Sequence, residues 1–270
     1  MPKRSDRKIL RGRFVKVRLD RLLVDRGLVP SRERAQALIL AGKVLVNEQK
    51  MEKAGAAVES DVPIRLLGGD LKYVSRGGLK LARALEYWHI EANGKVCLDV
   101  GASTGGFTDC LLQHGAARVI AVDTGHGQID FRLRQDPRVR LLEKTNARYL
   151  TQSQLGEPVD LIAMDVSFIS ATLVLPAVIA AAIAHSREAQ IIVLVKPQFE
   201  VGRTAVGKGG IVRDPAAQQA AVEKVRGCLQ GLGCKAIDVI DSPILGAEGN
   251  REFLLYALHP PGNREAAAGG

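Results

Sequence analysis

Seven short apolar runs between residues 96 and 258 constrain the fold most strongly, because helical stretches separate most of them. Aliphatic side chains dominate each run, and runs of this length are typical of strands covered on both faces. They are VCLDV (96–100), VIAVD (119–123), VRLL (139–142), DLIAMD (160–165), IIVLV (191–195), AIDVI (236–240) and FLLYAL (253–258). Strands that alternate with helices form a mainly parallel sheet. The sequence therefore predicts an α/β domain around a seven-stranded sheet with helices on both faces.

A glycine-rich turn, GASTGG at residues 101–106, follows the first run and leads into a helix from about Phe107. Ligands of open α/β sheets bind beyond the carboxyl ends of the strands, which is where this turn falls. Glycine lets the backbone approach a ligand closely and adopt positive φ. The turn lacks the lysine of a nucleoside-triphosphate P-loop and departs from the G-x-G-x-x-G of dinucleotide-binding folds. It therefore predicts a Rossmann-like ligand site of another kind.

Two acidic residues accompany this turn. Asp123 ends the next apolar run, where a carboxylate can accept hydrogen bonds from both ribose hydroxyls of a nucleoside. Asp99 lies two residues before the turn, where it can support the turn or meet an amino group of the ligand. The pattern favours a ligand that contains a nucleoside.

Four charged residues fall at the same predicted edge of the sheet. Lys80 lies on the helix before the first run, Asp165 and Lys196 end two later runs, and Glu252 precedes the last run. Pro197 stops its strand and keeps Lys196 at the tip. Two lysines and two carboxylates that converge on one rim predict a catalytic centre.

A second interpretation of the turn is a nucleophile elbow, because residues 101–105 also match G-x-S-x-G with Ser103 at its centre. An α/β-hydrolase needs a later acid and then a histidine, and the late histidines are His185 and His259. His259 follows the last strand and could serve. This alternative is the less favoured one, because it leaves Asp123 and the basic N-terminal region without a role.

The charge of the chain is concentrated at its N-terminus. Residues 1–83 hold 20 Lys and Arg against 9 Asp and Glu, whereas the remaining residues hold 18 against 20. A basic front joined to a nearly neutral body predicts that the front binds a polyanion.

Apolar spacing in this basic region predicts two short helices followed by small strands. The helices fall around residues 19–26 and 32–40, with Ser31 as the N-cap of the second. The strands fall around residues 44–46, 58 and 64–66, with a turn expected at 47–50.

The run RLDRLLVDRGLVPSRERAQALILAGKVLVN, residues 18–47, resembles the alpha-L RNA-binding domain of small-subunit ribosomal protein four and of pseudouridine synthases. The shared pattern is a leucine-rich helix, G-L, S-R-x-x-A and I-x-x-G-x-V-x-V-N. The resemblance implies a small α+β domain in which Arg32, Arg34 and Lys43 face RNA phosphates. Lys50 and Lys53 are further candidates, since they lie outside the apolar set. Such contacts add salt-dependent affinity and little sequence selectivity.

Both regions together resemble the TlyA (hemolysin A) family of ribosomal RNA ribose methyltransferases. The motifs that carry the resemblance are GASTGGFTD (101–109), MDVSFIS (164–170), VKPQFE (195–200) and GNREFL (249–254). It implies an FtsJ-type methyltransferase domain that uses S-adenosylmethionine. It also implies cytidine 2′-O-methylation in ribosomal RNA or ribosomal subunits, while the residues specify neither the nucleotide nor the subunit.

The resemblance assigns roles residue by residue. The Lys-Asp-Lys-Glu tetrad of the family falls on Lys80, Asp165, Lys196 and Glu252. Lys196 is the choice for the group that takes the ribose hydroxyl proton, and burial and the ammonium of Lys80 favour the loss of its own proton. An alternative is that Lys196 stays charged and only steers. The expected cofactor-binding residues are Asp99, Gly101, Ser103, Thr104, Gly105, Gly106, Phe107, Asp123 and Asn146.

The expected organisation is a basic arm (1–16), an alpha-L RNA-binding domain (17–66), a linker (67–75), a catalytic domain (76–260) and a flexible tail (261–270).

We expect a cytoplasmic protein without a bound metal. The N-terminus has no apolar run of a signal peptide, and the apolar stretch 168–184 contains Pro176 and is too short for a membrane helix. The cysteines form no C-x-x-C pair. The family name raises a membrane-active protein as a further alternative, and the lack of an amphipathic or spanning segment argues against it.

Overall fold

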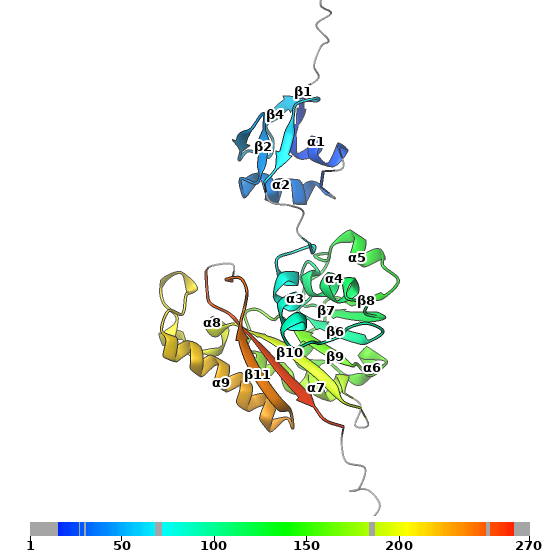
Figure 1. The fold of residues 1–270 in the computed structure, drawn as a ribbon, viewed down its shortest axis with the longest axis vertical. Helices are drawn as coiled ribbons and strands as arrows, with labels where there is room; N and C mark the ends of the chain where they lie inside the picture. The colour runs from blue at the N-terminus through cyan, green and yellow to red at the C-terminus, as the bar shows by residue number, and fades with distance from the viewer. Residues whose placement is uncertain are drawn as a thin grey trace, which may run out of the picture. The chain divides into compact units, whose positions relative to one another are not determined.

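The computed structural model describes residues 16–26, 28–29, 31–67, 72–183, 187–246 and 249–261. The chain divides into two compact units between residues 70 and 71, inside the predicted linker (Figure 1). The predicted arm up to residue 15 and the predicted tail from residue 262 lie outside the described residues. Each unit has a hydrophobic core of its own.

The first unit is a small α+β domain, as predicted. Its elements are β1 (Lys16–Arg18), α1 (Leu19–Asp25), α2 (Arg32–Leu40), β2 (Val44–Val46), β3 (Gln49–Met51), β4 (Ala57–Glu59) and β5 (Ile64–Leu66). Strand β1 pairs with β4, and β2 lies between β3 and β5, all antiparallel. The Ser31 hydroxyl accepts a hydrogen bond from the backbone N–H of Arg34 at 3.3 Å, which caps α2.

The predicted turn at 47–50 is shorter in the structure. Asn47 and Glu48 form a two-residue hairpin loop, both with positive φ (51° and 61°), and Lys50 lies in strand β3. Loops of this kind match the twist of the strands that they join, so a strand follows at once.

Within the described residues, seven strands form the sheet of the second unit, in the order β11-β12-β10-β9-β6-β7-β8. The strands are β6 (Val96–Val100), β7 (Arg118–Val122), β8 (Val139–Leu142), β9 (Leu161–Met164), β10 (Ala189–Val195), β11 (Lys235–Asp241) and β12 (Phe253–His259). Strands β10, β9, β6, β7 and β8 pair in parallel, whereas β12 is antiparallel to both of its neighbours. The prediction of a mainly parallel sheet is confirmed.

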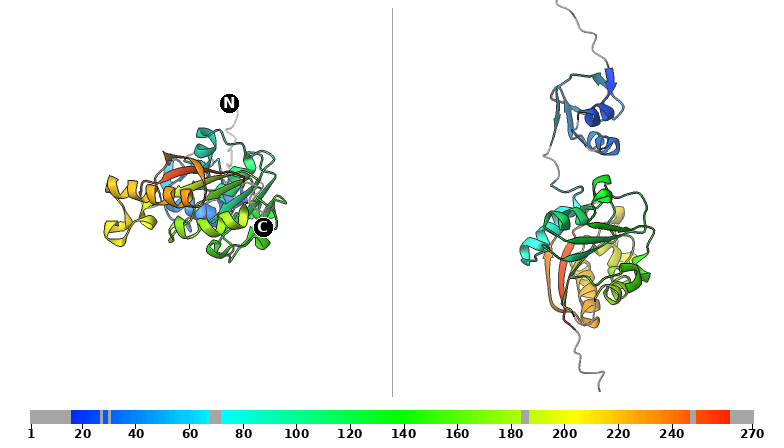
Figure 2. Two further views of the ribbon diagram at one scale, coloured as in Figure 1. Left: turned by 90° about the horizontal axis from the view of Figure 1, so that it is seen from below. Right: turned by 90° about the vertical axis from the view of Figure 1, so that its right-hand side faces the viewer.

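Helices cover both faces of this sheet (Figures 1 and 2). Helices α3 (Gly77–Tyr87), α4 (Gly106–Gln113) and α5 (Phe131–Gln135) pack into the core of one face. Helices α6 (Gln152–Leu155), α7 (Leu175–Ala182) and α9 (Pro215–Gly231) pack into the core of the other. The short helix α8 (Pro197–Glu200) begins directly after β10. Three-residue 3₁₀ turns lie at Ala147–Tyr149, Ala171–Leu173, Arg203–Ala205 and Lys208–Gly210.

The helix that carries Lys80, predicted before the first strand, ends at Tyr87. Within the apolar stretch 168–184, the described residues form an α-helix at Leu175–Ala182, with Pro176 in its first turn, and a 3₁₀ turn at Ala171–Leu173. Among the described residues, no helix is both long and apolar enough to cross a membrane.

Candidate active site

The glycine turn joins β6 to α4 at the carboxyl edge of the sheet. Gly101 has a φ of +88°, and a Cβ added to it would overlap the carbonyl oxygen of Asp165. Gly105 has a φ of +95° and stands at the N-cap of α4. Ser103, between them, also has a positive φ of 48°. Glycine is required at residue 101 because the turn presses against the neighbouring strand end.

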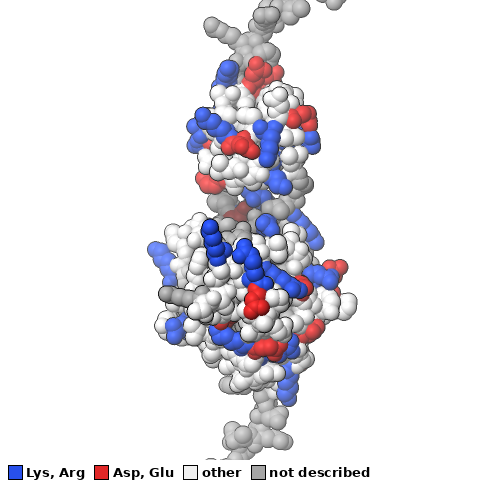
Figure 3. All heavy atoms as spheres, turned by 90° about the vertical axis from the view of Figure 1, so that its left-hand side faces the viewer, with Lys and Arg blue, Asp and Glu red and all other residues white. Residues whose placement is uncertain are grey.

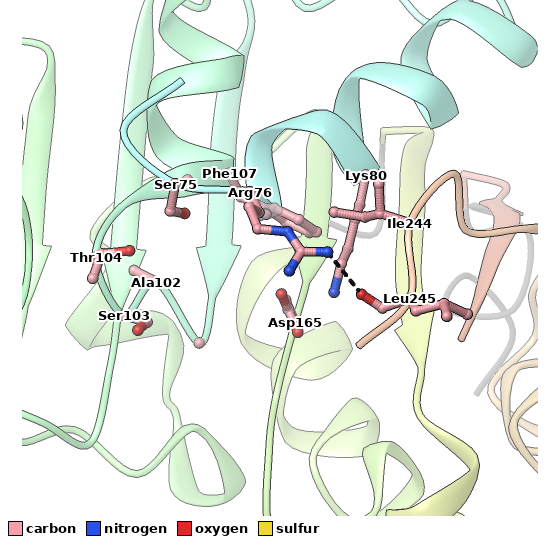
Figure 4. A pocket seen from close by; sticks show the side chains of 13 residues that line it. Ser75, Arg76, Lys80, Ala102, Ser103, Thr104, Phe107, Asp165, Ile244 and Leu245 are labelled. Atoms are coloured by element: carbon pink, nitrogen blue, oxygen red, sulfur yellow. Dashed lines mark hydrogen bonds between the residues drawn. The ribbon is translucent and has the colours of Figure 1, made fainter. Parts of the chain in front are cut away.

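Two cavities lie on either side of this turn. The first has a volume of about 210 Å³. Figure 4 shows the side chains of Lys80, Asp165 and Arg76 converging on it, with Arg76 donating a hydrogen bond to the carbonyl of Leu245 at 3.3 Å. The predicted cofactor residues that line it are Gly101, Ser103, Thr104, Gly106 and Phe107.

The second cavity is a cleft of about 510 Å³. Its walls come from the turn, from the loops after β7 and β8, and from the loop after β9. The predicted residues Asp123 and Asn146 line this cleft and not the first cavity. Because both cavities include Gly101, Ser103 and Asp165 in their walls, an elongated ligand in the cleft can reach the first cavity past these residues.

Asp123 connects two walls of the cleft. Its Oδ2 accepts the backbone N–H of Ser103 at 2.7 Å, and its Oδ1 accepts that of Gly125 at 2.6 Å. Each carboxylate oxygen has a further lone pair, so the group can still accept two hydroxyl hydrogen bonds. Asn146 lines the same cleft, and its Oδ1 also caps the turn at Ala147–Tyr149 through the N–H of Arg148 at 3.0 Å.

Asp99 lies beneath the turn and lines neither cavity. Its carboxyl group is fully buried, and the hydroxyl of Thr108 on α4 donates to its Oδ2 at 2.6 Å. Of the two roles expected for Asp99, this position favours support of the turn. Burial raises the pKa of Asp99 to about 7, against the hydrogen bond from Thr108, which lowers it.

This raised pKa predicts how stability depends on pH. Between about pH 4 and pH 7 the folded chain keeps a proton on Asp99 that the unfolded chain has lost, so stability falls as pH rises through this window. The isosteric Asp99→Asn has no such proton. We expect its free energy of unfolding, relative to wild type, to rise by about 4 kcal/mol from pH 4 to pH 8. Denaturant unfolding at several pH values checks this, and parallel curves for both proteins would contradict it.

The four charged residues of the rim form two ion pairs. Lys80 Nζ lies 2.5 Å from Glu252 Oε2, and both side chains are nearly buried. Lys196 Nζ lies 2.6 Å from Asp165 Oδ1. The structure thus pairs each lysine with a carboxylate. One member of each pair, Lys80 and Asp165, lines the first cavity.

Two residues of the loop after β9, Ser167 and Phe168, lie at the site but were not predicted from the sequence. The Ser167 hydroxyl accepts a hydrogen bond from Lys196 Nζ at 2.7 Å. Phe168 is 91% exposed at a φ of +64°, which is strained for an aromatic residue, and its ring lies 5.3 Å from that of Phe199. Both residues line the cleft or its mouth. Their place in the motif MDVSFIS was the available signal, but their contacts depend on tertiary structure.

The hydrolase alternative fails on geometry. Ser103 lies at the carboxyl edge of the sheet, whereas His259 pairs with Ala189 at the opposite end of β10. Seven residues of strand separate the two edges by about 20 Å. His185 lies outside the described residues.

The predicted RNA-binding side chains lie on the first unit. Arg32 is half exposed, and its Nε donates to the buried carboxylate of Asp20 at 2.9 Å. The Arg18 guanidinium, with Arg32, holds the pKa of Asp20 far below its usual range. Lys43 and Lys50 are exposed and Arg34 is half-buried, while Lys50 also lies 3.5 Å from Glu52.

On the face shown in Figure 3, basic and acidic side chains alternate on this unit. Residues 1–15 hold six Lys and Arg and one Asp, so they contribute part of the excess positive charge of the N-terminal region.

Residues 73–258 match the FtsJ-like methyltransferase family, and residues 17–62 match the S4 domain. A Rossmann-like sheet with a glycine turn, two cavities and paired lysines agrees with this match. The second unit is a methyltransferase domain.

Several relatives match both units. The 16S/23S rRNA (cytidine-2′-O)-methyltransferase TlyA of Mycobacterium tuberculosis is 47% identical over 242 residues, 89% of each chain. Hemolysin A of Brachyspira hyodysenteriae is 39% identical over 90% of this chain and 100% of its own. A candidate hemolysin of Streptococcus thermophilus has a solved structure with a TM-score of 0.71 and 39% identity, covering 94% of this chain and 92% of that chain. The chain belongs to the TlyA family of FtsJ-like methyltransferases.

Proposed function

We propose that this chain transfers a methyl group from S-adenosylmethionine to a ribose 2′-hydroxyl of ribosomal RNA, on cytidine. The observation that carries the proposal is the pair of lysine–carboxylate contacts beside a cavity that adjoins a nucleoside-sized cleft. The TlyA relative named for cytidine-2′-O-methylation of 16S and 23S rRNA supports the choice of substrate.

The lining of the cleft supports S-adenosylmethionine as the ligand. Asp123 would accept both ribose hydroxyls, and the loop after β8 with Asn146 and Ala147 would enclose the base. Because Gly101, Ser103 and Asp165 line both cavities, a ligand bound in the cleft would lie next to the first cavity. When bound, the cofactor supplies a methyl group on a positively charged sulfur.

Lys196 would act on the substrate hydroxyl. Its Nζ forms an ion pair with Asp165 and donates a hydrogen bond to Ser167, and these two contacts orient it. Toward the 2′-hydroxyl, a neutral amine would accept the proton, whereas an ammonium would only donate a hydrogen bond. Lys80, held by Glu252, would stabilise the negative charge that develops on the ribose oxygen.

An RNA substrate also accounts for the exposed aromatic ring and the basic first unit. Phe168, at the mouth of the cleft, offers a flat surface on which a base can stack. The S4 domain adds basic side chains for phosphates. Together they favour a nucleotide in RNA over a small-molecule acceptor.

The test is incubation of the protein with labelled S-adenosylmethionine and separated ribosomal subunits, followed by mapping of the methylated ribose. We expect label on a cytidine 2′-oxygen of small-subunit RNA, large-subunit RNA or both. Label on a base, or none on either RNA, would contradict the proposal.

We expect Asp123→Ala to weaken S-adenosylmethionine binding by about 1–3 kcal/mol, because charge-assisted hydrogen bonds to the ribose are lost. Calorimetric titration of the folded variant measures this. A matched control is Asp130→Ala, which removes a half-buried N-cap of α5 outside the cleft wall. Equal affinities of Asp123→Ala and wild type would refute the assignment of the cleft.

A further inference from the structure

Glu200 is a nearly buried carboxylate that the proposed chemistry does not use. Its side chain is only 2% exposed. It ends the short helix α8, four residues after Lys196. Burying a carboxylate is unfavourable unless hydrogen bonds and a cation compensate for lost hydration, and an apolar residue would fill the same space at lower cost. The contacts of Glu200 are therefore informative.

Those contacts go to the loop that follows β9. Glu200 Oε2 accepts the hydroxyl of Ser170 at 2.5 Å, and Oε1 accepts the backbone N–H of Ala171 at 2.6 Å. Lys224 on α9 closes the group, with its Nζ 3.3 Å from Oε2 and 2.8 Å from the carbonyl oxygen of Glu200. Three chain segments are thereby joined around one carboxylate.

Two of these segments, the loop after β9 and the chain at α8, also carry one of the ion pairs of the active site. Loop residues Asp165 and Ser167 contact Lys196, which directly precedes α8. The ring contact of Phe168 with Phe199 joins the segments a second time. The loop thus meets Lys196 at one end of this contact, through Asp165 and Ser167, and it meets Glu200 at the other end.

We propose that Glu200 is a positioning residue that holds the loop 165–171 against α8 and so sets the placement of Asp165 and Ser167 on Lys196. This inference rests on the proposed function. Displacing reacting groups by about 1 Å can cost about 10²-fold in rate, so loosening this contact acts on methyl transfer at a distance.

Single-turnover methylation at saturating RNA and donor tests the proposal in the full-length protein. Glu200→Ala should lower the rate by about 10²-fold. Glu200→Gln should recover most of that loss, because its amide oxygen can accept the N–H of Ala171 and its NH₂ can donate to Ser170. Glu223→Ala, an exposed glutamate on α9 paired with Arg226, is the matched control and should match wild type.

A purely structural role would lower the melting temperature without changing the rate of the folded enzyme. A second readout is the coupling between Glu200 and Ser167. Glu200→Ala should lower the rate by a smaller factor in a Ser167→Ala background than in wild type. If Glu200→Ala does not fold, Ser170→Ala breaks the same contact from the loop side and should slow the reaction in the same direction.

A folded Glu200→Ala variant that methylates as fast as wild type would overturn the inference. If Glu200→Ala does not fold, a wild-type rate for Ser170→Ala would overturn it. Additive effects of Glu200→Ala and Ser167→Ala would overturn it as well. A wild-type protein that methylates no ribose would instead contradict the proposed function.

Discussion

Lys196→Ala is expected to lower the single-turnover rate of methyl transfer by about 10²–10⁴-fold while S-adenosylmethionine binding stays nearly unchanged. The reason is that Lys196 acts on the substrate hydroxyl, so its contribution is realised mainly in the transition state. Lys95→Ala is a suitable control. Lys95 hydrogen-bonds to Gln190 at the opposite edge of the sheet and touches neither cavity.

Lys196→Arg distinguishes the two roles left open for this lysine. A guanidinium keeps its proton and cannot act as a base, so a base role predicts that arginine fails as alanine does. A purely electrostatic role predicts that arginine restores part of the rate. An arginine variant close to wild type would exclude the base role and leave the fold and family unaffected.

Lys80→Ala should also slow the reaction strongly, but it leaves the Glu252 carboxylate nearly buried without its partner. Removing one partner of such a pair destabilises a protein by about 3–5 kcal/mol. The double variant Lys80→Met with Glu252→Gln removes both charges and separates the loss of rate from the loss of stability. Alanine variants at both lysines with wild-type rates would refute ribose methylation as the function.

Removal of residues 1–70 is expected to lower RNA affinity by roughly 10²–10³-fold while S-adenosylmethionine binding is retained, because the phosphate contacts are lost. The division between the units falls at residue 70, and the remaining unit keeps both hydrophobic cores of its sheet. Calorimetry with donor and RNA binding measured at several salt concentrations check this. For the full chain, log K should fall by about 0.7–0.9 per neutralised phosphate for each unit of log salt.

Removal of residues 1–15 alone shows how much of this effect belongs to the basic arm. That segment holds six Lys and Arg, whereas residues 16–67 mix both signs of charge. We expect the shorter truncation to reduce the salt slope and to retain part of the affinity. If the protein without residues 1–70 were as active on ribosomal subunits as the full chain, this division of roles between the two units would be refuted.

Much of the fold followed from local pattern. The period and length of the apolar runs predicted seven strands, since burial on both faces demands apolar residues at every position. The edge at which Asp165 and Lys196 meet followed from the rule that parallel strands share their carboxyl ends. The S4 domain followed from a single continuous motif.

Other features depended on residues distant in the chain. The antiparallel placement of β12 between β10 and β11 brings Glu252 to Lys80, 172 positions earlier in the sequence, and turns His259 away from Ser103. Ser167 and Glu200 look like ordinary polar residues until the loop after β9 folds onto α8. Local patterns encode which residues are buried and where strands end. Which charges neutralise one another is decided only when strands and loops pack together, because an ion pair depends on distance in space and not in sequence.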